Sequence, residues 1–546
     1  MTTLLRKMAI LSVKGKSINH MLNFKLPVAY LTITAFVCGT LIMVIEVLGS
    51  RVIGPFFGVS LFVWSSLIAV TMIALAAGYA AGGILSDHRE HPDYLYGIIL
   101  AAGLLVILIP FLKAPVLKAS MPLGFRLGAF VSSLVLFGPP LLLLGCVSPY
   151  IIRIAAREMK SIGRTVGSFY ALSTIGSVVG TILTGFVLIV FIGVSQIFFL
   201  VGTILVLLAL FYFVYFRRKW SFLVLVLIPA AVLALTGRQN IEVTLPTGTV
   251  ASVVYAKDTH YGSIKIVDYK YGSHHTREMI VDGMIQTGVD MKNSLSIYPY
   301  TYLLGIIPYR LHPEGKRCLV IGLGGGAVPR WYEERGIRTD VVDIDPDVIR
   351  LAKEYFDFQG KGVTAVEDAR YFLGRGTDRY DYIVMDIFSG EAAPAHVISV
   401  EALQLVRNRL AAGGVLAINF TGRLGGDDFM TGSVVKTLKQ VFTNVEIYPI
   451  LNSGEEERIG NLELVAYNGP SKELPSDLIG QFEIHPFAVE EVKTAYRQKL
   501  IMPEDHRGVV LTDNYNPIDC YDNKVKEFIR QQVVAGTDWN ILVGSM

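Results

Sequence analysis

The chain divides into two halves by the way its hydrophobic residues are distributed. In the first half, long apolar stretches follow one another with short polar connections between them. Most are long enough for a helix to cross roughly 30 Å of hydrocarbon at about 1.5 Å per residue. We therefore predict a basic tail over 1–26 and a transmembrane domain of about seven helices over 27–236. The predicted spans are 27–49, 61–85, 95–112, 128–152, 166–192, 196–216 and 220–236, the last of which contains Pro229 and is also compatible with a re-entrant or tilted segment.

In the second half, short strand-like segments alternate with amphipathic helices. Three segments before residue 282 predict antiparallel strands, with a turn at Asp282-Gly283, and they define a small β-strand subdomain over 250–300. Strict strand–helix alternation then predicts a parallel, doubly wound sheet over 301–546. The last two strands have no helix between them, which indicates an antiparallel edge. The expected fold is a multispanning α-helical membrane domain followed by an α/β, Rossmann-like domain of the class I methyltransferase type. The strands expected for its sheet are 317–324, 339–345, 363–368, 380–388, 413–420, 444–450 and 461–468.

Composition supports the division into a lipid-facing and a soluble half. Hydrophobic residues make up 52% of the 546 residues and charged residues 17%, with a mean hydropathy of +0.48, which excludes a disordered or ordinary soluble chain. Residues 1–236 contain 17 Lys and Arg against 5 Asp and Glu, whereas the remainder is acidic. An acidic domain is unsuited to nucleic acid and suits a cationic small molecule. The four cysteines lack metal-ligand spacing, so we expect neither a disulfide framework nor a metal site.

The charges of the first half leave two questions open. Glu46, near the end of the first span, is costly in lipid unless it is paired; Arg51 is a candidate partner, and a proton or cation site is the alternative. The basic tail and the connections at 153–164 and 217–219 share one face, which the positive-inside rule makes cytoplasmic. Seven spans then place the second half outside, whereas chemistry on a cytosolic metabolite favours the inside. We expect a multi-pass protein of the cell (inner) membrane whose second half leans to the cytoplasmic side despite this conflict, with the lipid bilayer as one partner and a second copy of the chain as another candidate.

A glycine-rich turn follows the first strand of the predicted parallel sheet. Gly322, Gly324 and Gly326 fit either a plain tight turn or a turn whose backbone N–H groups approach a ligand. Asp343 ends the second strand, where a carboxylate accepts hydrogen bonds from both hydroxyls of a ribose. Asp368 ends the third strand, where it suits the adenine of an adenosyl ligand or a helix N-cap; Asp345 is more typical of an N-cap before Pro346. These positions share one edge of the sheet.

Further candidates follow the fourth strand and a later turn. Asp386 ends the fourth strand and is a candidate general base for an amine, with a capping role as the alternative. Glu391 and His396 lie in the next loop, where they fit either an acceptor pocket or solvent. Asp513 and Tyr515, in the turn-rich segment 511–517, fit either a cover over that pocket or a surface turn.

At these residues the sequence resembles the spermidine/spermine synthase (aminopropyltransferase) family, and within it bacterial proteins fused to an N-terminal multispanning membrane domain. The segments that carry the resemblance are Tyr261–Ile264, 281–286, the glycine turn, 343–349, 367–369 and Asp386 with Pro394, together with 57–64, 76–87 and 167–180 in the membrane half. The resemblance implies that Gly322, Gly324, Asp343 and Asp368 hold the adenosyl group of decarboxylated S-adenosylmethionine. It implies Asp386 as the base, and Gln286 and Tyr298 as contacts of the donor or acceptor chain.

Three departures from the family pattern affect residues that, in the family, bind the amino groups of the donor or the diamine. Gly325 stands where the family has an acid, Ser389 stands where a second aspartate follows the catalytic strand, and Gly262 replaces a glutamine. Lost charged hydrogen bonds are worth roughly 1.5–3 kcal/mol each, so the acceptor amine and the form of the donor stay open.

We therefore expect an enzyme that transfers an aminopropyl group to an amine and releases methylthioadenosine, without a tightly bound cofactor. An S-adenosylmethionine-dependent methyltransferase, a polyamine transporter with a sensing domain, and an enzyme acting on a lipid-borne amine are the alternatives.

Overall fold

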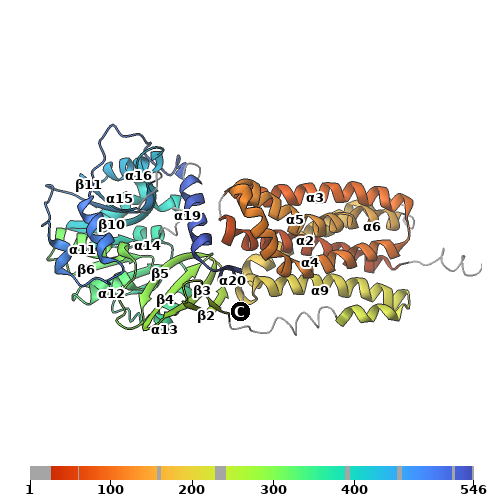
Figure 1. Ribbon diagram of the computed structural model, residues 1–546. Coiled ribbons are helices and arrows are strands. Elements are labelled where there is room, and N and C mark those ends of the chain that lie inside the picture. Colours follow the sequence, from red (N-terminus) through yellow and green to blue (C-terminus); the bar gives the residue numbers. More distant parts are fainter. Residues whose placement is uncertain are drawn as a thin grey trace, which may run out of the picture.

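The computed structural model describes residues 26–58, 61–156, 162–227, 241–387, 394–451, 458–518 and 523–543. A helical bundle and an α/β domain lie end to end, and the C-terminal helices lie between them (Figure 1). All but one residue of the predicted basic tail lies outside the described residues.

The bundle consists of long helices that run back and forth along its axis (Figure 1). Its α-helices are α2 Val28–Phe57, α3 Leu61–His88, α4 Pro92–Ser120, α5 Gly124–Gly145, α6 Val147–Ala156, α7 Ile162–Leu183, α8 Ile189–Phe191 and α9 Val194–Phe211. Two π-helical turns, η2 Thr184–Leu188 and η3 Tyr212–Phe216, and two 3-10 helices, η1 Met121–Leu123 and η4 Trp220–Val226, complete it.

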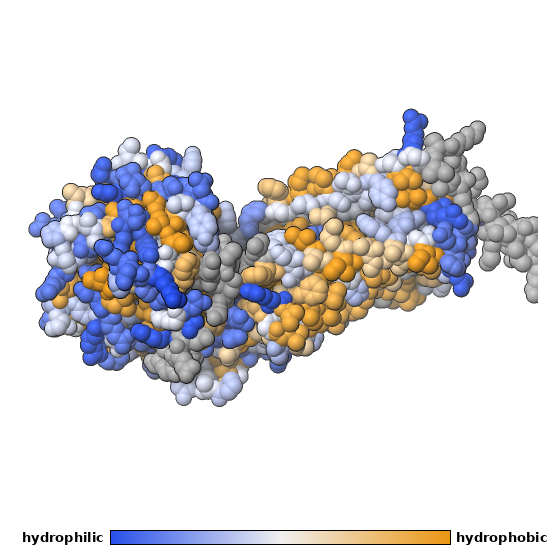
Figure 2. All heavy atoms as spheres, turned by 90° about the horizontal axis from the view of Figure 1, so that it is seen from above, coloured by the Kyte–Doolittle hydropathy of each residue, from blue (hydrophilic) through white to orange (hydrophobic). Residues whose placement is uncertain are grey.

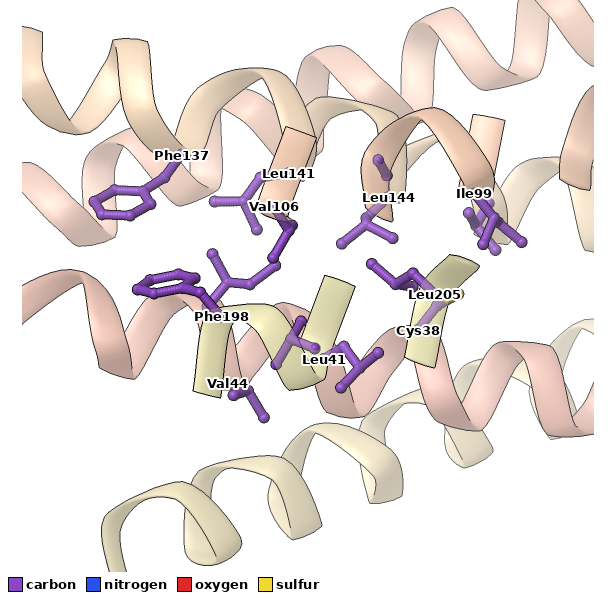
Figure 3. Packing of buried hydrophobic residues seen from close by; sticks show 14 of the residues in the cluster. Cys38, Leu41, Val44, Ile99, Val106, Phe137, Leu141, Leu144, Phe198 and Leu205 are labelled. Carbon is purple, nitrogen blue, oxygen red and sulfur yellow. The ribbon is translucent and has the colours of Figure 1, made fainter. Parts of the chain in front are cut away.

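Small residues allow these helices to pack closely. A Cβ atom at Gly180 of α7 would lie 2.2 Å from the Thr40 carbonyl oxygen of α2, and one at Gly78 of α3 would lie 2.3 Å from the Leu142 carbonyl oxygen of α5. Between the helices, interdigitated apolar side chains such as Leu41 fill the interior (Figure 3). Close backbone approach of this kind is how helices associate where water supplies no driving force.

Five helical segments of the described residues are long and apolar enough to cross a membrane. One of them, Pro92–Ala155, has 64 residues and contains α4 and α5, which pack side by side and therefore count as two candidate spans. The described residues thus contain six candidate spans, where about seven were predicted. The seventh predicted span begins with the short helix η4, and most of it lies outside the described residues.

The α/β domain begins with a five-stranded antiparallel sheet in the order β1-β2-β3-β4-β5. Its strands are β1 Glu242–Thr244, β2 Val250–Asp258, β3 Ser263–Tyr271, β4 His274–Val281 and β5 Met284–Asp290. Three of these strands were predicted; β1 and β5 were not. The turn between β4 and β5 is the predicted Asp282-Gly283, where both residues have positive φ.

The second sheet has seven strands in the order β11-β12-β10-β9-β6-β7-β8. The strands are β6 Arg317–Ile321, β7 Arg338–Asp343, β8 Thr364–Val366, β9 Tyr380–Met385, β10 Leu410–Arg423, β11 Asn444–Leu451 and β12 Ile459–Tyr467. The central strands are parallel, and β12 pairs antiparallel with both β10 and β11. The predicted doubly wound sheet with an antiparallel edge is therefore confirmed. Its helices are α11 Pro299–Leu311, α12 Ala327–Glu333, α13 Pro346–Tyr355, α14 Ala369–Arg375, α15 Val400–Arg409, α16 Phe429–Lys439 and α17 Val489–Arg497, with the 3-10 helices η5 Ala395–Val397 and η6 Leu478–Gln481.

Two C-terminal helices, α19 Asn523–Gly536 and α20 Trp539–Val543, join the two parts. Arg530 of α19 is fully buried and donates to the carbonyl oxygens of Pro55 in the bundle and Asp282 in the small sheet, at 2.7 and 2.6 Å. Lys265 of β3 donates to the last carbonyl groups of α20. Arg51 donates to the His260 carbonyl oxygen, and no ion pair with Glu46 occurs within the described residues. The predicted Glu46–Arg51 pair is therefore wrong.

Candidate functional site

The glycine turn lies at the carboxyl edge of the large sheet, between β6 and α12. Gly322 has φ +88°, and a Cβ atom there would lie 2.2 Å from the Asp386 carbonyl oxygen. Gly324 and Gly326 also have positive φ, which disfavours other residues. The turn therefore places backbone against the end of β9, in the crevice where open α/β sheets bind ligands.

Asp343 ends β7 directly beside this turn. Its two carboxylate oxygens accept hydrogen bonds from the backbone N–H groups of Leu323, at 2.8 Å, and Asp345, at 2.9 Å. Burial raises the pKa of this carboxyl to about 6. The residue predicted to bind a ribose is thus hydrogen-bonded to the predicted glycine turn. Each carboxylate oxygen of Asp343 retains a further lone pair for a hydroxyl group.

Asp386 ends β9 on the other side of the turn. Its Oδ1 accepts a hydrogen bond of 2.8 Å from the side-chain amide of Asn419 on β10. Burial is the main cause that raises the pKa of Asp386 to about 6; the charge of Asp343 acts in the same direction, and the hydrogen bond from the Asn419 amide opposes the shift. A carboxylate that titrates near neutrality is a stronger base than an ordinary aspartate, as proton abstraction from an amine requires.

Asn419 and Glu463 extend the candidate site beyond the residues predicted from the sequence. Asn419 pairs with Glu463 of β12 in the strand register, and Met385 pairs with Ile418. Asp386, Asn419 and Glu463 therefore form a row across three adjacent strands. The sequence contained one signal for these two site residues: each is a polar residue within an apolar run, 413–420 or 461–468.

Tyrosines of α11 and its N-terminus cover the other side of this crevice. The Tyr300 hydroxyl donates to the Gln286 carbonyl oxygen at 2.9 Å, and the charges of Asp386 and Glu463 add to burial in raising its pKa. The predicted contact Tyr298 donates to Glu278 at 2.6 Å. Gln286 therefore lies at the crevice, while the hydroxyl of Tyr298 is engaged by the small sheet; their substrate contacts stay predictions.

The remaining predicted residues lie toward β8 and α15. Asp368 caps α14 by accepting from the Tyr371 N–H at 3.0 Å, and its other oxygen contacts His396 Nε2 at 3.0 Å. Asp345 caps α13, as predicted. Helix capping and contact with an adenine both stay compatible with the position of Asp368, because capping leaves lone pairs of its carboxylate oxygens free.

Asp513 is held by its neighbours rather than by solvent. Arg370 and Ser399 donate to its carboxylate and hold its pKa at about 2. Tyr515 is 55% exposed. Their acceptor roles stay predictions, and Glu391 and Ser389 lie outside the described residues.

The two departures from the family pattern in which a glycine replaces a larger residue have a steric explanation. A Cβ atom at Gly325 would lie 2.6 Å from Thr287 Cγ2, and one at Gly262 would lie 2.8 Å from the Asp282 carboxylate. Thr287 and Asp282 therefore occupy the space that larger side chains at these positions would need.

Several known proteins are similar to the second half of the chain. Residues 298–451 match the spermine/spermidine synthase domain family. A polyamine aminopropyltransferase of Vibrio vulnificus is 28% identical over 42% of this chain and 77% of its own length. An N-terminal histidine N-methyltransferase of Emericella nidulans is 35% identical over 24% of this chain, but the match covers 25% of that protein. A solved probable spermidine synthase of Corynebacterium glutamicum has 20% identity and a TM-score of 0.36, covering 42% of this chain and 84% of its own.

The second half is thus a Rossmann-like α/β domain with acidic residues at the carboxyl edge of its large sheet. More particularly, its residues 298–451 match the spermine/spermidine synthase domain, and polyamine aminopropyltransferases are among the proteins similar to it.

Proposed function

We propose that the protein is a membrane-anchored aminopropyltransferase that uses decarboxylated S-adenosylmethionine and an amine acceptor. The acceptor nitrogen attacks the propyl carbon next to the sulfonium. The carbon–sulfur bond breaks, its electron pair neutralises the sulfur, and methylthioadenosine leaves. Asp386 takes the proton that the new ammonium loses. In-line positioning supplies most of the acceleration, because the sulfonium is already a good leaving group.

The observation that carries this proposal is the meeting of Gly322, Asp343 and Asp386 at one sheet edge. Asp343 bonds to the glycine turn, and Gly322 leaves no room for a side chain beside Asp386. An adenosyl donor whose ribose contacts Asp343 therefore directs its alkyl arm toward Asp386.

The bundle supports the anchoring part of the proposal. Figure 2 shows apolar side chains along its flank, and Phe186 and Phe191 are 74% and 80% exposed. Apolar surface of that kind over a multi-helix bundle is typical of contact with lipid.

A product assay tests the proposal. The detergent-purified protein is incubated with decarboxylated S-adenosylmethionine and a panel of diamines, and the products are identified by mass. We expect methylthioadenosine together with an amine enlarged by an aminopropyl group. The absence of both across the panel would contradict the proposal.

A methyltransferase is the second candidate, because the histidine N-methyltransferase is the more identical of the two relatives over its short match. The same assay with S-adenosylmethionine separates the two candidates: S-adenosylhomocysteine indicates methyl transfer, and methylthioadenosine indicates aminopropyl transfer.

A further inference from the structure

The loop between β2 and β3 is held by the helical bundle at two points. Both strands lie at the end of the α/β domain that faces the bundle (Figure 1). Asp258, the last residue of β2, accepts a hydrogen bond of 2.9 Å from the backbone N–H of Val194, the first residue of α9. The His260 carbonyl oxygen accepts a hydrogen bond of 2.5 Å from Arg51 of α2. The bundle therefore holds the chain on both sides of Thr259.

The side chain of Thr259 uses all of its hydrogen-bonding groups. It is buried, and its hydroxyl oxygen accepts from the backbone N–H groups of Tyr261 and Gly262, at 3.1 and 3.2 Å. The hydroxyl donates its proton to Asp345 Oδ2 at 2.8 Å. Because a hydroxyl has one donor and two acceptor sites, the conformation of the loop fixes the direction of this O–H bond toward Asp345.

Asp345 connects this loop to the carboxylate that is predicted to bind the ribose. Its Oδ1 accepts from the Asp347 N–H at 2.9 Å, and its own backbone N–H donates to Asp343 Oδ1, also at 2.9 Å. The position of Asp343 therefore depends on the backbone at Asp345. That backbone is held by the start of α13 on one side and by Thr259 on the other.

Helix capping does not by itself explain the bond from Thr259. An N-cap aspartate needs one oxygen to accept from the first turn of its helix, and Oδ1 of Asp345 provides it. The bond from Thr259 to Oδ2 is an additional constraint, and it joins the small sheet to the large sheet. The continuous path therefore runs from Arg51 in the bundle, through the loop, to Asp343 in the crevice.

We propose that Thr259 is a positioning residue for Asp343, and that Arg51 makes the bundle part of the donor site by holding the loop that carries Thr259. This inference rests on the proposed function, because it assigns how the ribose-binding carboxylate is held. The bundle is then more than an anchor: a shift of α2 against the α/β domain changes the affinity for the adenosyl donor.

Binding measurements on Thr259→Val test the inference, because valine keeps the shape of the side chain and removes its hydroxyl. Isothermal titration of the full-length protein in detergent compares methylthioadenosine with an analogue that lacks both ribose hydroxyls. We expect the wild type to prefer methylthioadenosine, and Thr259→Val to lose this preference by roughly tenfold, as for a hydrogen bond to a charged group. Affinity for the analogue stays unchanged, whereas a merely structural role would weaken both compounds alike. Thr259→Ser keeps the hydroxyl and is expected to retain the preference.

Arg51→Met tests the contribution of the bundle, because it removes the donor to His260 and keeps an apolar stem. We expect the preference to fall by roughly threefold, as for an ordinary hydrogen bond. The matched control is Arg126→Met: Arg126 lies at the same end of the bundle, but its guanidinium stacks within the bundle, 4.4 Å from the centre of the Phe62 ring. This control is expected to keep the wild-type preference. Arg51→Met combined with Thr259→Val is expected to lose no more than Thr259→Val alone, because both residues act along one path.

The outcomes separate the inference from the proposed function. Wild-type preference in both Thr259→Val and Arg51→Met, or equal weakening of both compounds, would overturn the inference. Losses that add up in the double variant would overturn the role of Arg51. If Thr259→Val does not fold, Arg51→Met decides, because its side chain lies outside the core of the α/β domain. Absence of methylthioadenosine binding by the wild type would instead contradict the proposed function.

Discussion

Asp386 is the residue on which the proposed chemistry depends most directly. Its carboxylate accepts from Asn419 and lies next to the glycine turn, so replacement by asparagine removes the base with little change of shape. We expect Asp386→Asn to lower kcat by roughly 10²–10⁴-fold, the usual contribution of a positioned base, while methylthioadenosine still binds. Turnover near the wild-type rate, measured by methylthioadenosine release, would remove Asp386 from that role.

The raised pKa of Asp386 also predicts how the rate depends on pH. Below a pKa of about 6 the carboxyl is protonated and accepts no proton, and above it the carboxylate is available. With saturating substrates, we therefore expect kcat to rise about tenfold per pH unit below pH 6 and to level off above it. The residual activity of Asp386→Asn is expected to lack this rise of kcat with pH, which forms the acidic limb of the profile. A limb near pH 4 in the wild type would show that Asp386 titrates as an ordinary aspartate.

At the residue scale, the sequence was sufficient to predict the candidate site residues that lie at the ends of strands. Asp343 and Asp386 each end a strand, and that position was sufficient to bring them together. Asn419 and Glu463 were not predicted as site residues because they lie inside long apolar strands. Their importance depends on which strands become neighbours, and the strand order β9-β10-β12 is not written in either segment.

At the element scale, α19 is the part of the fold that local pattern did not reveal. The strands of the large sheet are recognisable from alternation within each segment. The position of α19 depends instead on Arg530, whose two acceptors, Pro55 and Asp282, lie hundreds of residues away in the sequence. The missed strand β5 likewise depends on its pairing with β4.

The same contact gives a prediction about how the two parts are held together. Arg530→Met keeps an apolar stem but leaves the Pro55 and Asp282 carbonyl groups without this donor. We expect it to lower the free energy of unfolding by roughly 1.5–3 kcal/mol, and to increase hydrogen exchange at the β4–β5 turn. Gln532→Ala, at an exposed position of the same helix, is the control and should change stability by less than about 0.5 kcal/mol. Identical melting of Arg530→Met and wild type would exclude α19 as a tie between bundle and catalytic domain.

At the scale of the whole molecule, the bundle has one strongly basic end, and that end lies opposite the catalytic domain. Arg153 contacts Asp87 and Glu90 there, and Arg217 contacts Asp93. Figure 2 shows hydrophilic residues at this far end and an apolar flank between it and the α/β domain. The start of α2 and Arg217 lie at this far end, whereas β1 lies in the α/β domain at the other end. For a bundle that spans a membrane, these positions place the start of α2 and the α/β domain on opposite sides.

The positive-inside rule then predicts the side of the membrane on which the catalytic domain lies. The far end and its tail carry Arg6, Lys7, Lys14, Lys16, Lys25, Arg89, Arg153, Arg157, Lys160, Arg164, Arg217, Arg218 and Lys219, whereas the near connections carry Arg51, Lys113, Lys118 and Arg126. Because Lys and Arg in short connections stay cytoplasmic, we expect the far end to be cytoplasmic and the catalytic domain to face the other side. Adenosyl donor and amine would then have to reach the site from outside the cytoplasm.

Cysteine labelling in intact cells tests this orientation. Gly163, at the far end, and Gly480, in the catalytic domain, both have open space around a Cβ atom. Cys38, Cys146 and Cys318 are buried, so a Cys520→Ser background leaves the new thiol as the accessible one in the described part of the chain. We expect a membrane-impermeant maleimide to label Gly480→Cys in intact cells and to label Gly163→Cys after the cells are opened. The reverse pattern would place the catalytic domain with the cytosolic metabolites, and it would mean that the folding of the large α/β domain, rather than the basic connections, determines the topology.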